Sequence, residues 1–403
     1  MSKLVGIKAY PINDSRGDKT LEVEVELDNG YKAKASVPSG GGQANVVHVV
    51  DVSVAVRNVE GDIKPKLIGL ELTDQAAIDK IITDLDGTPD KSRLGANTTL
   101  AVSIAMARAL AKSNSVSLFE HIGRSFDEGK SIKMPTPVFN AINGGQHADN
   151  NIDYQEFMTV PVGPPSFKEK LDAGMNIFNK LKAVLEAKGL KTGVGDEGGY
   201  APDLDTNEMA LGLLLEAIKE AGYIPGKDVF LAIDVAASFL PPTFQLTDKH
   251  YVDLLKTYPI IYLEDPLPAD DWHWWTQLDI QMHEIDREGK TVFLVGDDIF
   301  STNADRLRQG VKENVGNAIL IKPNQAGTIS EILDVIRVAK ENNYVHIISH
   351  RAGETEDSFI ADLAVGTGAG YIKAGAPNPE HRERMVKYER LAEIEQELKA
   401  EKV

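Results

Sequence analysis

The sequence predicts an α/β protein whose C-terminal part is a (β/α) barrel, preceded by a region of mixed strands and helices. Six short apolar runs each end at a charged or ionisable side chain: Asp234, Glu264, Asp297, Lys322, His350 and Lys373. Consecutive members are 23 to 33 residues apart, the length of one strand and one helix, and repeated βα units form a parallel sheet. Units that close into a barrel place the active site at the C-terminal strand ends. We therefore expect these side chains to meet at one barrel mouth.

Composition limits the class of protein. The chain has 403 residues, enough for two domains, and its 42% hydrophobic and 26% charged residues are typical of a soluble globular protein. A net charge of −18 argues against a nucleic-acid surface or an anionic membrane as partner. Cysteine is absent, which excludes disulfides and a cysteine nucleophile. No signal segment or membrane-length apolar run of ~20 residues is present, so we expect a cytoplasmic protein.

The N-terminal region divides into strands, a loop and helices. Residues 1–35 alternate apolar and polar side chains between turn signals, which predicts a β-meander. Residues 37–45 contain three consecutive glycines, and this loop is either a mobile lid over a site or a plain linker. Apolar residues then recur at helical spacing through residues 46–123.

The polar stretch 123–131 predicts the boundary between a first domain of residues 1–128 and a second of residues 134–403. The second domain opens with apolar runs and an amphipathic helix that ends at Gly189. Glu197 then lies among glycines in a loop, where packing does not explain a carboxylate.

Three of the predicted strand ends carry carboxylates: Asp234, Glu264 and Asp297. Carboxylates brought together repel each other or take up protons unless a cation lies among them. Ligands that are all oxygen favour a hard cation, and an open, partly hydrated coordination shell suits Mg²⁺. The alternative is that each carboxylate caps the helix that follows it.

The remaining strand ends predict an acid and a base. Lys322 and Lys373 should face the cation across the mouth, where a lysine beside Mg²⁺ and a second lysine should have a lowered pKa and act as a base. Alternatively, both lysines bind phosphate or carboxylate. Glu156 and Glu197 should lie on the other side, where one could protonate a leaving group that the other holds.

Three further side chains supply donors suited to a phosphate: His147, His350 and Arg351. A lone histidine is as often structural. A base, an acid on the opposite side and a divalent cation together describe proton removal next to a carboxylate, followed by loss of a β-substituent. The proton is weakly acidic, and Mg²⁺ can stabilise the dianionic enolate that its removal forms.

The segments that carry these residues resemble the enolase family over nearly the whole chain. The matching segments are DSRG at 14–17, VPSG at 37–40, LDGTPDKSRLGAN at 85–97, INGGQHADNNIDYQEFM at 142–158, GVGDEGG at 193–199, LEDP at 263–266, GDD at 296–298, IKPNQAGT at 321–328, SHR at 349–351 and GETEDSFIADLAVG at 353–366. The resemblance implies an N-terminal α+β domain that caps a TIM-like (β/α)8 barrel of the enolase type with atypical first strands. It also implies a cytoplasmic homodimer or higher homo-oligomer.

The resemblance further implies a reaction, the Mg²⁺-dependent, reversible dehydration of 2-phospho-D-glycerate to phosphoenolpyruvate in glycolysis and gluconeogenesis. A lysine base with Mg²⁺ is the established pattern of this superfamily and not a deduction from the sequence. Lys322 would remove the C2 proton, and Glu197, aided by Glu156, would assist departure of the C3 hydroxyl. The metal ligands would be Asp234, Glu264 and Asp297. The substrate contacts would be His147, Gln155, Glu156, His350, Arg351 and Lys373.

Three positions depart from the family pattern. The loop reads VPSGGGQA in place of VPSGASTG, so Gly42 replaces a serine that would bind a second Mg²⁺, and the charged segment after the loop is missing. Ala352 replaces a serine that would bind the phosphate, a loss of roughly 1.5–3 kcal/mol. IKAGAP replaces IKTGAP, and a longer connection follows it. These departures leave two alternatives: a paralogue that eliminates water from another hydroxy acid, or a non-catalytic binding protein on the same fold.

Overall fold

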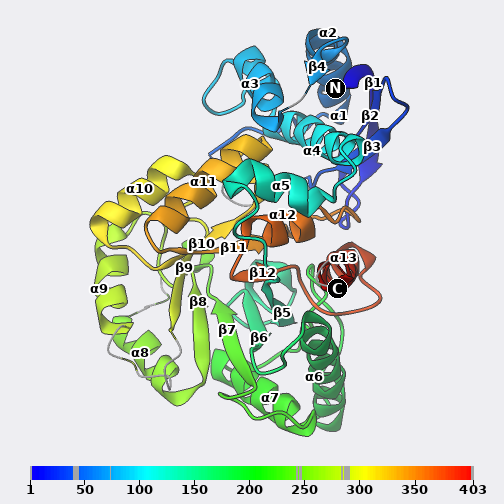
Figure 1. Ribbon diagram of the computed structural model, residues 1–403. Coiled ribbons are helices and arrows are strands. Elements are labelled where there is room, and N and C mark those ends of the chain that lie inside the picture. Colours follow the sequence, from blue (N-terminus) through cyan, green and yellow to red (C-terminus); the bar gives the residue numbers. More distant parts are fainter. Residues whose placement is uncertain are drawn as a thin grey trace.

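The computed structural model describes residues 2–39, 45–72, 74–241, 244, 247–282, 285 and 291–400. Within these ranges the chain forms a four-stranded sheet with its helices, followed by a closed eight-stranded barrel (Figure 1). None of the described helices combines the length and apolar character needed to span a bilayer.

The N-terminal sheet is antiparallel, as the alternating sequence predicts. β1 (Ser2–Asn13), β2 (Lys19–Leu27) and β3 (Lys32–Ser36) form the meander, and β4 (Glu71–Leu72) pairs with β1, giving the order β3-β2-β1-β4. Every second side chain of β2 is buried, because this face packs against helix α4 (Ala96–Ser113). The other face of the sheet carries the charged residues of the same alternation.

Helices follow the sheet over the region where the sequence predicts them. Besides α4, they are α1 (Val52–Arg57), the π-helical turn η1 (Asn58–Ile63), α2 (Lys64–Leu67), α3 (Gln75–Asp86) and α5 (Leu118–Asp127). α5 begins at a capping box between Ser117 and Glu120. The polar stretch 123–131 is therefore not an open linker throughout, because its first half is the last part of α5.

The barrel closes in the order β10-β11-β12-β5-β6-β7-β8-β9. Its strands are β5 (Thr136–Asn143), β6 (Glu156–Pro161), β7 (Val229–Asp234), β8 (Ile260–Glu264), β9 (Phe293–Gly296), β10 (Ala318–Ile321), β11 (Val345–Ser349) and β12 (Tyr371–Lys373). β6 runs antiparallel to both neighbours, and the other pairings are parallel. The first strands are thus atypical, whereas β7 to β12 are the six predicted βα repeats.

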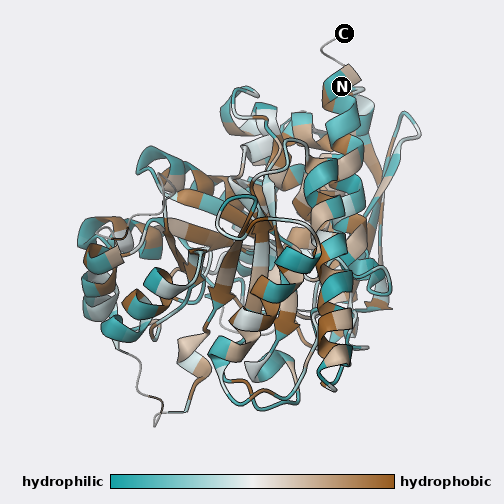
Figure 2. Ribbon diagram, turned by 90° about the horizontal axis from the view of Figure 1, so that it is seen from below, coloured by the Kyte–Doolittle hydropathy of each residue, from teal (hydrophilic) through white to brown (hydrophobic). Residues whose placement is uncertain are grey.

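Helices surround the barrel and complete its connections. They are α6 (Phe167–Ala187), α7 (Asn207–Glu220), α8 (Asp248–Thr257), α9 (Trp272–Met282), α10 (Ala304–Glu313), α11 (Ile329–Glu341), α12 (Phe359–Thr367) and α13 (Arg382–Ala400). Three short 3-10 turns, η2 (Gly145–His147), η3 (Ala237–Phe239) and η4 (Pro323–Gln325), lie in connections between these elements. Hydrophobic residues concentrate on the central strands and hydrophilic residues on the outer turns of the helices (Figure 2).

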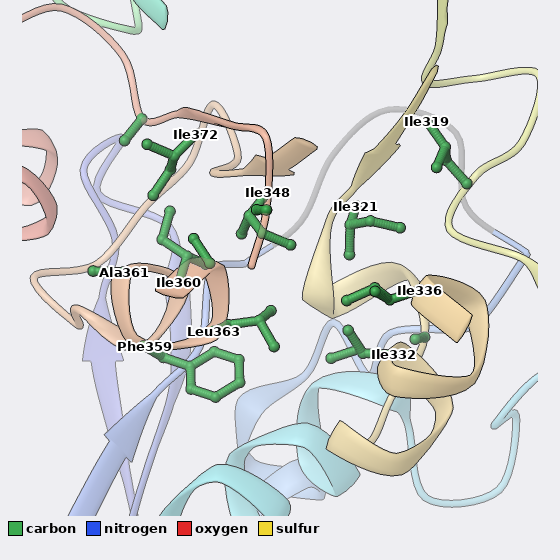
Figure 3. Packing of buried hydrophobic residues seen from close by; sticks show 14 of the residues in the cluster. Ile319, Ile321, Ile332, Ile336, Ile348, Phe359, Ile360, Ala361, Leu363 and Ile372 are labelled. Carbon is green, nitrogen blue, oxygen red and sulfur yellow. The ribbon is translucent and has the colours of Figure 1, made fainter. Parts of the chain in front are cut away.

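Two apolar cores follow from the alternation along the strands. Ala318 and Leu320 belong to a cluster drawn from strands alone, which fills the barrel interior. Ile319 and Ile321 belong to the larger cluster that includes residues of α11 and α12, and Figure 3 shows Ile321 beside Ile336 of α11. Since successive strand residues point to opposite faces, Lys322, the residue after Ile321, belongs to the inner row at the barrel mouth.

Candidate active site

The strand register brings the predicted residues to one mouth of the barrel. Asp234 at the end of β7 pairs with Glu264 at the end of β8. Asp234 also pairs with Glu156, because β6 runs in the opposite direction and begins where its neighbours end. Lys373, the last residue of β12, pairs with Ser349 at the end of β11. An antiparallel strand therefore contributes its first residue to the same site.

A cavity of about 450 Å³ opens at this mouth, within the size range of small-molecule sites. Its described wall includes nearly all the predicted site residues: His147, Gln155, Glu156, Glu197, Asp234, Asp297, Lys322, His350, Arg351 and Lys373. Glu264, also predicted, is fully buried and does not belong to that described wall. Ala352, the substituted position, lies in the wall as well.

Lys373 forms a buried cationic centre beneath the cavity. Its Nζ lies 2.8 Å from Oε2 of Glu264, 3.0 Å from Oε2 of Glu156 and 3.5 Å from Oδ2 of Asp234. Burial opposes a charged amine, but these carboxylates outweigh it and raise the pKa of Lys373 well above its usual value. The Tyr262 hydroxyl also donates to Oε2 of Glu264 at 2.5 Å. Lys373 is therefore protonated and acts as a counter-ion for the carboxylates.

Lys322 pairs directly with Asp297, to which its Nζ donates a hydrogen bond. Burial opposes the charge on Lys322, but the Asp297 carboxylate outweighs it, and the pKa of Lys322 is raised. The expectation of a lowered pKa for Lys322 is wrong for this arrangement. Sequence reasoning counted a cation and a second lysine as neighbours and missed the carboxylate that the structure places against the amine.

Two residues that the sequence analysis missed lie beside Asp297. Asp265 accepts from the backbone N–H groups of Asp297 at 3.0 Å and Asp298 at 2.8 Å, which fixes the turn after β9. Burial and the charge of Asp297 raise the pKa of Asp298 to about 7. Both residues are neighbours of predicted ligands in LEDP and GDD, and that adjacency was the available signal.

Among the described residues, two sets each bring three possible metal-ligand atoms within 4.8 Å of one another. One set is Asp265, Asp297 and Asp298, and the other is His147, Glu156 and Glu197. The predicted trio of Asp234, Glu264 and Asp297 does not form such a set. Burial and the charge of Asp234 raise the pKa of Glu264 to about 8. The carboxylates at the mouth therefore carry more negative charge than the ammonium of Lys373 balances. Oδ1 of Asp297 is buried without a hydrogen-bond partner among the described residues. An all-oxygen cluster with an unpartnered oxygen fits a hard divalent cation such as Mg²⁺.

Glu156 and Glu197 form a carboxylate pair on the other side of the mouth. Nδ1 of His147 lies 3.7 Å from Oε1 of each, and Asn140 donates to Oε2 of Glu197 at 2.9 Å. Burial and the charge of Glu197 raise the pKa of Glu156 well above its usual value. Burial opposes ionisation of Glu197 too, but the His350 and His147 rings hold its pKa well below its usual range. The two shifts run in opposite directions, so Glu156 takes up a proton more readily than Glu197.

The phosphate-binding candidates are buried in the wall. Burial lowers the pKa of Arg351, whose Nη1 has no hydrogen-bond partner among the described residues. Gln155 donates from Nε2 to Oδ2 of Asp234 at 3.3 Å. An arginine with an unpartnered N–H is suited to an anionic oxygen of a ligand.

The N-terminal part of the chain holds the loop that follows Lys322. Nε2 of His48 lies 2.7 Å from the carbonyl oxygen of Asn324, and the Thr99 hydroxyl donates to the carbonyl of Gly327 at 2.8 Å. No sequence signal distinguished His48. Gly42, on which the predicted loss of a second Mg²⁺ site depends, lies outside the described residues.

Comparison with known protein families agrees with this geometry. The family model described as the N-terminal domain of enolase matches residues 4–122. The model described as the C-terminal TIM barrel domain of enolase matches residues 131–242 and 242–403. Together the two matches cover nearly the whole chain, and the chain belongs to the enolase family.

Proposed function

We propose that the protein is a hydro-lyase that reversibly dehydrates 2-phospho-D-glycerate to phosphoenolpyruvate. One observation carries the proposal: Lys322 follows β10, and Glu156 begins β6, which lies four strands away in the ring of eight. The amine and the carboxylate pair therefore face each other across the cavity. An elimination that takes a proton from one face of the substrate and loses a hydroxyl from the other needs this arrangement.

The chain's own residues would act in a defined order. Lys322 would take the proton from C2, and the pair of Glu156 and Glu197 would deliver a proton to the departing C3 hydroxyl, which leaves as water. Arg351 would bind the phosphate, where Ala352 supplies no hydroxyl, whereas both ring nitrogens of His350 face protein groups, Arg384 and Glu197. Lys373 would keep the carboxylate cluster neutral enough to accept an anionic substrate.

The residues that would hold Mg²⁺ are Asp234, Glu264 and Asp297, with Asp298 beside them. The cation would stabilise the negative charge of the enolate. If Asp297 held the cation, its ion pair with Lys322 would weaken, and the pKa of the Lys322 amine would fall toward the value a base needs.

Absorbance of phosphoenolpyruvate, followed with Mg²⁺ and after chelation, tests the reaction. Turnover should require the cation, and no turnover at millimolar substrate would remove the proposal. Lys322→Ala should abolish exchange of the C2 proton with solvent deuterium, whereas the exposed Lys182→Ala should not change it. Exchange that survives in Lys322→Ala would mean that another group is the base.

Ala352 in the cavity wall favours one second candidate, elimination of water from a hydroxy acid that lacks this phosphate contact. Comparing kcat/KM for 2-phosphoglycerate with that for unphosphorylated hydroxy acids decides between the two. Saturable binding of both without turnover would support a binding protein instead. We also propose, from the family resemblance, a cytoplasmic homodimer or larger homo-oligomer, which light scattering after gel filtration tests.

A further inference from the structure

Arg384 is a fully buried side chain that the proposed reaction does not use. It belongs to α13, and its relative exposure is 0%. Its position in the chain gives no hint of a role at the site, because it lies more than 30 residues after His350. An arginine is among the residues least often buried completely, so its set of partners needs an explanation.

The guanidinium of Arg384 joins two loops of the cavity wall. Nη1 donates to the carbonyl of Arg351 at 2.6 Å, and Nη2 donates to the carbonyls of Ala352 at 2.6 Å and Asp196 at 2.9 Å. Nη1 also lies 2.6 Å from Nδ1 of His350. One planar group thus contacts the turn that carries His350 and the loop that carries Glu197.

The contact with His350 determines which ring nitrogen carries the proton. A guanidinium has donors and no acceptor, so Nδ1 of His350 must accept the hydrogen bond. Burial lowers the pKa of His350 to about 3, and the ring is therefore neutral near neutral pH. A neutral ring has one N–H, which must be on Nε2.

The Nε2–H group faces Glu197. Nε2 of His350 lies 3.3 Å from Oε2 of Glu197 and has no well-aligned hydrogen-bond partner among the described residues. In the opposite tautomer, an N–H on Nδ1 would meet the N–H of Arg384, and the lone pair of Nε2 would face a carboxylate. Both contacts would be repulsive, so Arg384 selects the tautomer that stabilises ionised Glu197.

We propose that Arg384 is a positioning residue that fixes His350 as the Nε2–H tautomer and thereby turns the ring N–H toward Glu197. The tautomer follows from the contacts alone. The consequence for catalysis rests on the proposed function, in which Glu197 must be held in place when the hydroxyl departs.

Nitrogen NMR of the unsubstituted protein tests the tautomer directly. With ¹⁵N-labelled histidine, the ring signals of His350 are those lost in His350→Gln. We expect one protonated nitrogen, Nε2, and one unprotonated nitrogen, Nδ1, at neutral pH. A proton on Nδ1, or on both nitrogens, would overturn the proposal, whatever the activity of the protein.

Arg384→Lys tests the consequence, because it keeps the charge and loses the planar fork. We expect kcat to fall about 10- to 100-fold, the effect of losing one charge-assisted hydrogen bond, while KM changes less than about threefold. The His350 ring signals should then show a mixture of tautomers. Arg390→Lys is the matched control, since Arg390 lies on the same helix and pairs with Asp362 at 2.9 Å. It should leave kcat unchanged.

The outcomes separate the two proposals. Unchanged kcat and an unchanged ring spectrum in folded Arg384→Lys would refute the positioning role. If this variant does not fold, the spectrum of the unsubstituted protein decides. If the unsubstituted protein shows no turnover with 2-phosphoglycerate, the proposed function fails, and the spectrum still supports or refutes the tautomer.

Discussion

Replacement of Lys373 by methionine should strongly destabilise the protein. Methionine is similar in length and removes the charge that lies within 3.5 Å of Glu156, Asp234 and Glu264. Removal of one partner from a buried ion pair costs about 3–5 kcal/mol, and we expect a loss in this range because these carboxyl groups share Lys373 as their ammonium. The loss arises because buried carboxylates without a counter-ion repel one another or must take up protons.

Denaturant unfolding followed by tryptophan fluorescence measures this loss as a change in the free energy of unfolding. The matched control is Lys340→Met, because Lys340 is 48% exposed and pairs with Asp127 at 2.7 Å on the surface. Its loss should cost at most about 1 kcal/mol. Mg²⁺ should stabilise Lys373→Met more than the unsubstituted protein, since a cation can replace the lost ammonium. A destabilisation of Lys373→Met no larger than that of the control would refute the reasoning.

Three further predictions concern other parts of the chain. Burial raises the pKa of Asp79 from 3.8 to about 6, so between these two pH values the folded protein binds more protons than the unfolded chain. The free energy of unfolding should therefore fall by about 3 kcal/mol as pH rises through this range. Asp79→Asn should remove this pH dependence. His48→Ala should lower kcat up to about tenfold, because the loop after Lys322 loses the hydrogen bond from His48 to the carbonyl of Asn324. His48→Gln keeps a donor near that position and should restore kcat. Equal kcat values in the two variants would contradict a role for this hydrogen bond. Gly174→Ala should destabilise by about 1–3 kcal/mol, because its Cβ would overlap the Phe139 ring and force it to shift. Gly212→Ala in α7 meets open space and should stabilise slightly, and thermal unfolding compares the two variants.

The spacing of the strand-end residues predicted the barrel mouth, because a βα unit has a nearly constant length and a strand alternates its side chains. Asp234, Asp297, Lys322 and Lys373 therefore line one cavity, as expected. The antiparallel direction of β6, by contrast, was not predicted: the resemblance implied only atypical first strands, and nothing in the residues of that run indicates its direction.

What the sequence by itself determined is which residues are available at the mouth and in what order the strands supply them. What only the tertiary structure decided is which of them touch: Lys322 with Asp297, Lys373 with Glu264, and Arg384 with His350. These partners lie 25 to 109 residues apart and belong to different elements. Their separation in space depends on how the barrel closes and how α13 packs behind it. A pKa, and with it the acid or base role of each group, depends on burial and on distances of a few ångströms, which a linear pattern does not contain.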